Sequence, residues 1–264
     1  MTSTPSVHDV AIRANVSAST VSRAFTRPEL VSEKTRNRVL QAASELNFSV
    51  SRSSMALKSG QSFRIALLLS TPVTTWFGGN IFEGLDMVFH PAGYDISIYP
   101  INNVKSRADF FDVLPARRNA DAVIVPSFNV DSREVARLKT MNVPIAGINT
   151  VSNENMSVWA AIDDAHGLRL IVRHLVSLRH RRITYVCRDP QSLLTLSAAQ
   201  RIRGIQGGLR AGPYQSTTFW LFRTEDDSLQ STFNALINMQ PMPTAICCQE
   251  DGIAIPLMCR LREF

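Results

Sequence analysis

The spacing of apolar residues changes near residue 64, and this change divides the chain into two parts. Before it, apolar positions such as Val10, Ala14 and Val21 recur at helical spacing in short segments. After it, short apolar runs typical of buried strands alternate with helical patterns. The sequence therefore predicts a small all-α headpiece, followed by an α/β region in which helices flank parallel sheets.

Three helices are predicted in the headpiece, and each follows a serine that can cap it. The three capping serines are Ser6, Ser17 and Ser32. Asp9 completes a capping box with the first serine, so the first helix should begin near Val7. Asn15 tolerates the left-handed conformation and should end that helix. Pro28 breaks any helix, which predicts a loop over residues 27–31.

The segment from Ser17 to Arg23 differs from an ordinary surface helix in what it exposes. It buries Val21 and presents short hydroxyl side chains and one arginine. A helix with such a face fits the DNA major groove, where its side chains can reach base edges and phosphates. The first two helices therefore form a candidate DNA-binding helix-turn-helix.

Residues 47–63 are rich in serine and weakly apolar, as expected of a linker. Within them, residues 51–58 could form two turns of helix, with Ser51 as a cap and Gly60 as a stop. So short a helix is unstable alone. We therefore predict a hinge helix that forms only when a partner is present.

Beyond residue 64 the alternating pattern is long enough for two parallel sheets. Strands are predicted at residues 65–69, 96–99, 122–125, 144–148, 159–162, 183–187, 218–222 and 244–248. The first sheet would span residues 64–162 and the second would begin at residue 163. Ligands of such sheets bind outside the carboxyl ends of the strands, which predicts a binding cleft between two lobes.

Charge sharpens the assignment of the headpiece. Residues 1–64 carry nine basic and four acidic residues, so most of the formal net charge of +6 lies in the first quarter of the chain. A basic head on a nearly neutral body indicates a polyanionic partner.

Several other functional classes find little support in the sequence. No apolar run is long enough for a transmembrane helix, and no secretory signal is visible, so a cytoplasmic protein is expected. The cysteines and histidines lack metal-ligand spacing, which predicts no metal site. Nucleophile-elbow and phosphate-loop motifs are absent, so neither an enzyme nor a cofactor is expected.

These residues together resemble the lac repressor (LacI/GalR) family of bacterial transcription regulators. The resemblance is carried by residues 7–23 (V-x-D-V-A-x-x-A-x-V-S-x-x-T-V-S-R), 31–39 (V-S-x-x-T-R-x-x-V) and 43–48 (A-x-x-L-N-F). It continues through Ile162-Asp163-Asp164, Arg201-x-x-Gly204 and Pro243-Thr244-Ala245. The family resemblance implies that the α/β region is a two-lobed, periplasmic-binding-protein-like effector domain.

The resemblance also implies roles for residues of the headpiece and hinge. Ala18, Ser19 and Arg23 match positions near base edges, whereas Thr20, Ser32 and Thr35 match positions that contact phosphates. Leu57 matches a residue that wedges between base pairs in the minor groove. The complete set of DNA-binding candidates is Ser6, Ser17, Ala18, Ser19, Thr20, Ser22, Arg23, Ser32, Thr35, Ser54, Leu57 and Lys58.

In the effector cleft, the resemblance points to a sugar or another small polar molecule. Arg201 and Asp251 match residues that hydrogen-bond sugar hydroxyls or purine edges, and two charged groups can hold a polyol by paired bonds. Trp76 and Phe77 match an aromatic pair that can stack on a sugar ring. The effector-binding candidates are Trp76, Phe77, Asp163, Ser197, Arg201 and Asp251.

The sequence thus predicts four segments: a headpiece (1–48), a hinge (49–63), an N-terminal lobe (64–162) and a C-terminal lobe (163–264). The last lobe looks incomplete because no strand follows its final helix. The expected function is a homodimeric, operator-binding regulator, most simply a repressor, controlled by a small-molecule effector. Two alternatives remain open: a sugar-binding protein without regulatory activity, and a non-functional truncated product.

Overall fold

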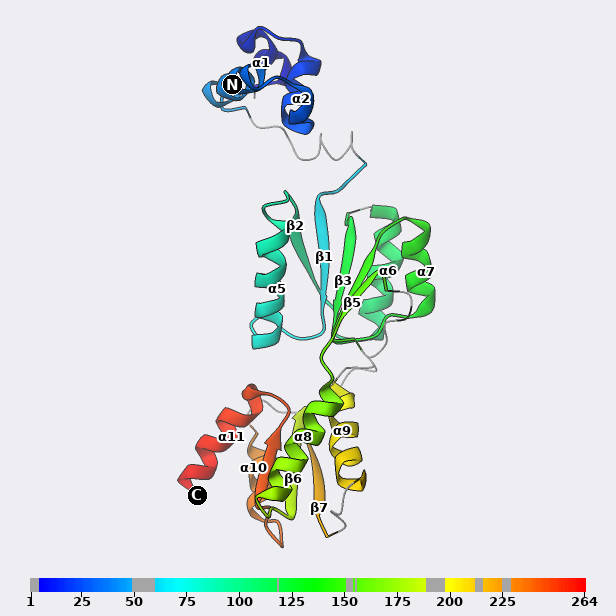
Figure 1. The fold of residues 1–264 in the computed structure, drawn as a ribbon, viewed down its shortest axis with the longest axis vertical. Helices are drawn as coiled ribbons and strands as arrows, with labels where there is room; N and C mark the ends of the chain where they lie inside the picture. Colours follow the sequence, from blue (N-terminus) through cyan, green and yellow to red (C-terminus); the bar gives the residue numbers. More distant parts are fainter. Residues whose placement is uncertain are drawn as a thin grey trace. The chain divides into compact units, whose positions relative to one another are not determined.

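The computed structural model describes residues 5–48, 60–117, 119–150, 154, 156–188, 198–211, 216–224 and 229–264. The chain divides into two compact units, residues 1–63 and 64–264 (Figure 1). No helix within the described ranges has the length and apolarity needed to cross a membrane.

The first unit is a bundle of short helices around one small core. Its elements are α1 (Val7–Ala14), α2 (Ala18–Thr26), the 3₁₀ helix η1 (Pro28–Leu30) and α3 (Glu33–Glu45). The predicted helix boundaries are confirmed, because Ser6, Ser17 and Ser32 cap the three α-helices. Asn15 ends α1 in the left-handed conformation with φ of 50°. The predicted loop at 27–31 is corrected: it contains η1, since proline suits the first turn of a helix.

One contiguous apolar cluster holds this unit together. Its fully buried members are Val10, Ala11, Ala14, Val21, Ala24, Val39, Ala42 and Ala43. The ends of α1 and α3 are joined in addition by an ion pair between the Arg13 guanidinium and Glu45, with a shortest N–O distance of 2.6 Å. The neighbouring guanidinium lowers the pKa of the Glu45 carboxyl. The core thereby fixes α2 on α1 and α3 and leaves the outer face of α2 to solvent.

The second unit contains two parallel sheets, as the alternating pattern predicts. The five-stranded sheet has the order β2-β1-β3-β4-β5 and the three-stranded sheet the order β7-β6-β8. Their strands are β1 (Arg64–Leu69), β2 (Asp95–Pro100), β3 (Ala122–Pro126), β4 (Ile145–Ile148), β5 (Val158–Ala160), β6 (Arg182–Arg188), β7 (Thr218–Thr224) and β8 (Ala245–Cys248).

Helices cover both faces of each sheet (Figure 1). They are α5 (Trp76–Phe89), α6 (Val104–Arg117), α7 (Ser132–Thr140), α8 (Asp164–Ser177), α9 (Ala198–Ala211), α10 (Gln230–Ile237) and α11 (Asp251–Glu263). In the first sheet, α5 packs on one face, and α6 and α7 pack on the other. In the second sheet, α8 and α9 share one face, and α10 and α11 cover the opposite face.

A glycine sets the distance between α8 and α9. A Cβ atom at Gly204 would lie 2.6 Å from the backbone oxygen of Ala165, which is closer than atoms can approach. One turn later, a Cβ at Gly208 would lie 3.4 Å from Cα of Arg169. The two helices therefore run side by side in the same direction, and their closest approach requires glycine.

Candidate DNA-binding face and effector site

The N-terminus of α2 presents a compact group of hydroxyls to solvent. The Ser17 hydroxyl accepts a hydrogen bond from the Thr20 backbone N–H at 3.2 Å. The same hydroxyl lies 2.8 Å from the hydroxyls of Ser19 and Thr20. Free N–H groups and the helix dipole at this end favour an anion such as a phosphate.

Further along α2, exposed side chains follow the hydroxyl cluster. Ala18, Ser19 and Arg23 are exposed, while Ser22 is half-buried. Val21 and Ala24 face the core, so this packing orients the exposed side chains outward. Arg23 makes no ion pair with any other residue that the structure describes. Its guanidinium is therefore available to bind a base edge or a phosphate.

Two more helix N-termini in the headpiece carry hydroxyls. The Ser32 hydroxyl donates to the Thr35 hydroxyl at 2.9 Å and caps α3. The Ser6 backbone N–H donates to the Asp9 carboxylate at 2.8 Å, which lowers the pKa of Asp9. Ser6 and Ser32 are exposed, and Thr35 is half-buried. The hinge candidates Ser54, Leu57 and Lys58 lie outside the described residues, so their roles stay predictions.

The clearest polar cluster of the second unit surrounds Arg201 in the first turns of α9. Its Nε donates to Asp164 at 3.0 Å, and its Nη1 donates to the Gln249 carbonyl at 2.7 Å. The Asp164 side chain is only 6% exposed, whereas that of Arg201 is 28% exposed. The arginine thus reaches from a buried carboxylate toward solvent.

The rest of the cluster gathers at the carboxyl ends of strands. Asn149, directly after β4, donates to the second Asp164 oxygen at 3.3 Å. Arg188, at the end of β6, donates to Glu250 at 3.2 Å. Ligands of parallel α/β sheets bind at this edge.

A buried tyrosine lies beside the same cluster. Tyr185 of β6 is 1% exposed, and its hydroxyl has no hydrogen-bond partner among the described residues. Burial raises the pKa of this phenol, so it remains a neutral donor.

The predicted effector candidates occupy different parts of the second unit. Arg201 and Asp251 are not joined by a hydrogen bond or ion pair in the described structure; Asp251 is exposed at the start of α11. Asp163 caps α8 by accepting from the His166 N–H at 2.8 Å. Trp76 and Phe77 begin α5, with Trp76 75% exposed and Phe77 half-buried. Ser197 lies outside the described residues.

Sequence reasoning missed Asp164, Asn149 and Tyr185 as parts of this site. Asp163 and Asp164 are adjacent, and only packing decides which carboxylate faces inward. The one available signal was the helix pattern: Asp164 lies four residues before Leu168 and so shares its buried face.

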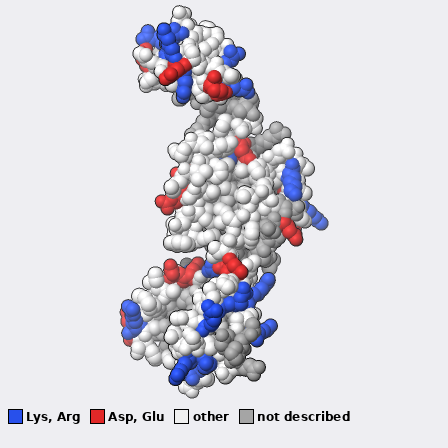
Figure 2. All heavy atoms as spheres, viewed as in Figure 1, with Lys and Arg blue, Asp and Glu red and all other residues white. Residues whose placement is uncertain are grey.

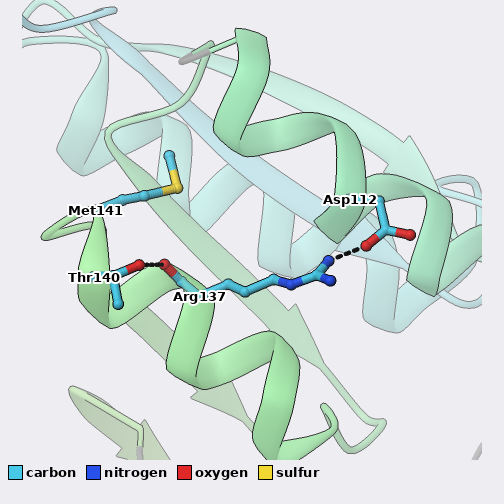
Figure 3. A pocket seen from close by; sticks show the side chains of 4 residues that line it. All are labelled: Asp112, Arg137, Thr140 and Met141. Atoms are coloured by element: carbon cyan, nitrogen blue, oxygen red, sulfur yellow. Dashed lines mark hydrogen bonds and ion pairs between the residues drawn. The ribbon is translucent and has the colours of Figure 1, made fainter.

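A surface hollow of about 590 Å³ lies away from all of these candidates. It is lined by Asp112 of α6 together with Arg137, Thr140 and Met141 at the end of α7 (Figure 3). Arg137 pairs with Asp112 across it. The two charges neutralise each other, and none of the predicted site residues lines this hollow. No group of three or more potential metal ligands occurs within the described parts of the chain.

We expect the buried carboxylate of Asp164 to matter more for stability than its exposed neighbour. Replacing Asp164 with Asn would leave Arg201 without a counter-charge and should lower the free energy of unfolding by about 1–3 kcal/mol. This is less than for a fully buried pair, because Arg201 is partly solvated. Urea denaturation followed by circular dichroism measures the loss.

Asp163→Asn is the matched control, since the exposed amide oxygen can still accept from the His166 N–H. Its cost should stay under about 0.5 kcal/mol. Equal losses in the two variants would contradict a special role for Asp164.

Comparison with known proteins identifies both units. Residues 6–51 match the model of bacterial regulatory proteins of the lacI family. Residues 172–264 match that of the periplasmic binding protein-like domain. The HTH-type transcriptional repressor PurR of Mannheimia succiniciproducens is 26% identical over 262 residues, covering 97% of this chain and 77% of that protein. PurR of Klebsiella pneumoniae is 25% identical, covering 97% and 75%.

Solved structures agree over nearly the whole chain. The lac repressor dimer bound to operator and the anti-inducer ONPF superposes with a TM-score of 0.79 at 22% identity, covering 99% of this chain and 78% of that one. A transcriptional regulator CelR–cellobiose complex gives a TM-score of 0.60 at 21% identity, covering 98% and 78%. These relatives are transcriptional regulators rather than enzymes. The chain therefore carries a helix-turn-helix domain that matches the lacI family of bacterial regulatory proteins, followed by a periplasmic binding protein-like domain.

Proposed function

We propose that this chain is a cytoplasmic repressor that binds operator DNA as a homodimer. Its affinity for the operator falls or rises when a small molecule binds. The outer face of α2 carries the proposal. There the capped N-terminus and the exposed Ser19 and Arg23 stand on a helix that the core holds in place. Two such faces in a symmetric dimer would read a roughly palindromic operator.

The effector that we favour is a sugar. Arg201 has five N–H donors in a planar fork, and the bonds to Asp164 and Gln249 engage Nε and Nη1. The remaining donors suit neighbouring hydroxyls of a polyol. The structural relatives include proteins described with cellobiose and with bound ribose. Asp251, Asp163, Trp76, Phe77 and Ser197 complete the proposed site.

Regulation would act through the hinge and through the junction between the two lobes of the second unit. We propose a headpiece of residues 1–48, a hinge of residues 49–63 and two lobes meeting near residue 163. An effector that binds one arrangement of the lobes better than another shifts their equilibrium. If the hinge helices pair only in one arrangement, operator affinity changes with it.

Operator binding tests the proposal directly. DNA selected from a random pool by the full chain should contain a palindrome and should bind at least about a thousand-fold more tightly than random duplexes. The affinity should fall steeply with rising salt as phosphate contacts are lost. Equal affinity for selected and random DNA would reject sequence-specific regulation.

A second experiment identifies the effector class. Thermal unfolding of the chain across a panel of sugars and nucleobases should show a higher Tm with the cognate ligand, because a ligand that binds the folded state stabilises it. If only nucleobases raised the Tm, the effector would be a nucleobase and not a sugar.

A further inference from the structure

The exposed side of the α8–α9 pair carries an arginine cluster that the proposed function does not use. The arginine face, as we define it, consists of Arg169 and Arg173 on α8 with Arg203 and Arg210 on α9; all four side chains are exposed. From residue 163 to residue 264 every basic side chain is an arginine or a histidine, and none is a lysine. In Figure 2, basic side chains gather over these two helices.

The close contact between the helices makes these arginines one surface. Gly208 meets Arg169, where its Cβ would lie 3.4 Å from Cγ of the arginine. The stem of Arg169 therefore lies along α9. Arg203 and Arg210 are seven residues apart, or about 10 Å along the helix axis. Helices in contact lie about 8–10 Å apart, so the four charges cover a patch of roughly two helical turns.

Little acidic charge neutralises this patch. Its one ion pair among the described residues joins Arg169 to Asp163, at the limiting distance of 4.0 Å. The other carboxylate of α8, Asp164, is buried against Arg201, and the sequence of α9 contains no acidic residue. Arg173, Arg203 and Arg210 have no hydrogen-bonded or ionic partner in the described structure. Three guanidinium groups without a partner and a fourth that is paired only at 4.0 Å, all on helices, are suited to planar oxyanions.

An exposed apolar side chain of α8 borders the arginine face. Leu170 is 40% exposed and lies three residues before Arg173, so the two share one side of the helix. A nucleic acid backbone offers oxyanions but little apolar surface, whereas an acidic protein segment can supply carboxylates and apolar side chains together. Arginine pairs with carboxylates through two parallel hydrogen bonds.

We propose that the arginine face is a docking surface for an acidic, amphipathic segment of a partner protein. This goes beyond the proposed function, because the four arginines belong neither to the headpiece nor to the proposed effector-binding residues. The segment binds with carboxylates on the four arginines and with an apolar side chain on Leu170. An exposed helix of about two to three turns has the matching length.

A synthetic acidic helix tests the docking surface. The probe is a fluorescein-labelled peptide of Glu, Leu and Ala, about 18 residues or 27 Å long. Its binding to the full chain is measured at physiological ionic strength, where screening acts beyond about 8 Å. Arg169→Gln/Arg173→Gln and Arg203→Gln/Arg210→Gln should each weaken binding about ten-fold, as expected for losing charge-assisted bonds. Replacing leucine with serine in the peptide should weaken it as well.

The matched control is Arg133→Gln/Arg262→Gln, which removes two exposed arginines of the second unit outside the arginine face. Binding should change less than about two-fold, as for exposed charges remote from the site. A similar loss in all three double variants would overturn the proposal, since net charge alone would then explain binding. If the first two variants lost affinity for random duplex DNA as strongly as for the peptide, the arginine face would be a nucleic acid binding site instead.

Discussion

Replacing Gly204 with alanine should destabilise the second unit by about 2–4 kcal/mol, a large part of a typical domain's stability. The added methyl would lie 2.6 Å from the Ala165 carbonyl oxygen and 2.7 Å from its Cα, and both are backbone atoms that cannot swing aside. To make room, α9 must move away from α8. That movement separates Arg201 from Asp164 and opens the apolar contacts between Ile205 and α8.

Gly207 provides the control within the same helix. A Cβ there meets nothing within 4 Å, so Gly207→Ala should stabilise the unit by up to about 1 kcal/mol, because alanine favours helix. Urea denaturation of both variants, followed by circular dichroism, measures the two effects. If the free energy of unfolding changed with the same sign in both variants, the α8–α9 contact would not depend on glycine.

Replacing Arg23 with alanine should lower the ratio of operator affinity to random-DNA affinity about ten- to a hundred-fold. The reason is that one bidentate arginine–base contact carries about 1–3 kcal/mol of discrimination. Arg23 is exposed on α2, and the neighbouring core residues Val21 and Ala24 are untouched by the change. The headpiece should therefore keep its fold, as circular dichroism would show.

Arg262→Ala is the matched control, because it removes the same charge from an exposed position on α11. It should leave the ratio of operator to random-DNA affinity unchanged in a fluorescence anisotropy titration. A drop of the same size for selected and random DNA in Arg23→Ala would make Arg23 a phosphate contact and would contradict base reading.

The helices of the headpiece could be predicted closely because their boundaries depend on local chemistry. A serine oxygen caps the N–H groups within its own turn, and an asparagine adopts φ above zero by itself. The parallel sheets also follow from the sequence, since strands buried on both faces require continuous apolar runs. The predicted loop was wrong at residues 28–30, where proline begins a short helix instead of preventing one.

The effector cluster was predictable only in part, because it depends on contacts between distant segments. The helical pattern places Arg201 on α9, but nothing in it says that the side chain would reach Asp164, 37 residues earlier. The tandem acids Asp163 and Asp164 look alike in sequence, and their opposite environments arise from packing. The pairing of Arg201 with Asp251 remains a prediction.

The glycine contact between α8 and α9 also has a mechanical consequence. Two helices whose backbones touch cannot slide or roll past each other without a steric clash. We therefore expect them to move as one rigid body. Arg201 stands at one end of α9, and Arg210 stands about 14 Å further along it. A ligand that moves Arg201 would therefore carry the arginine face with it as part of one rigid body.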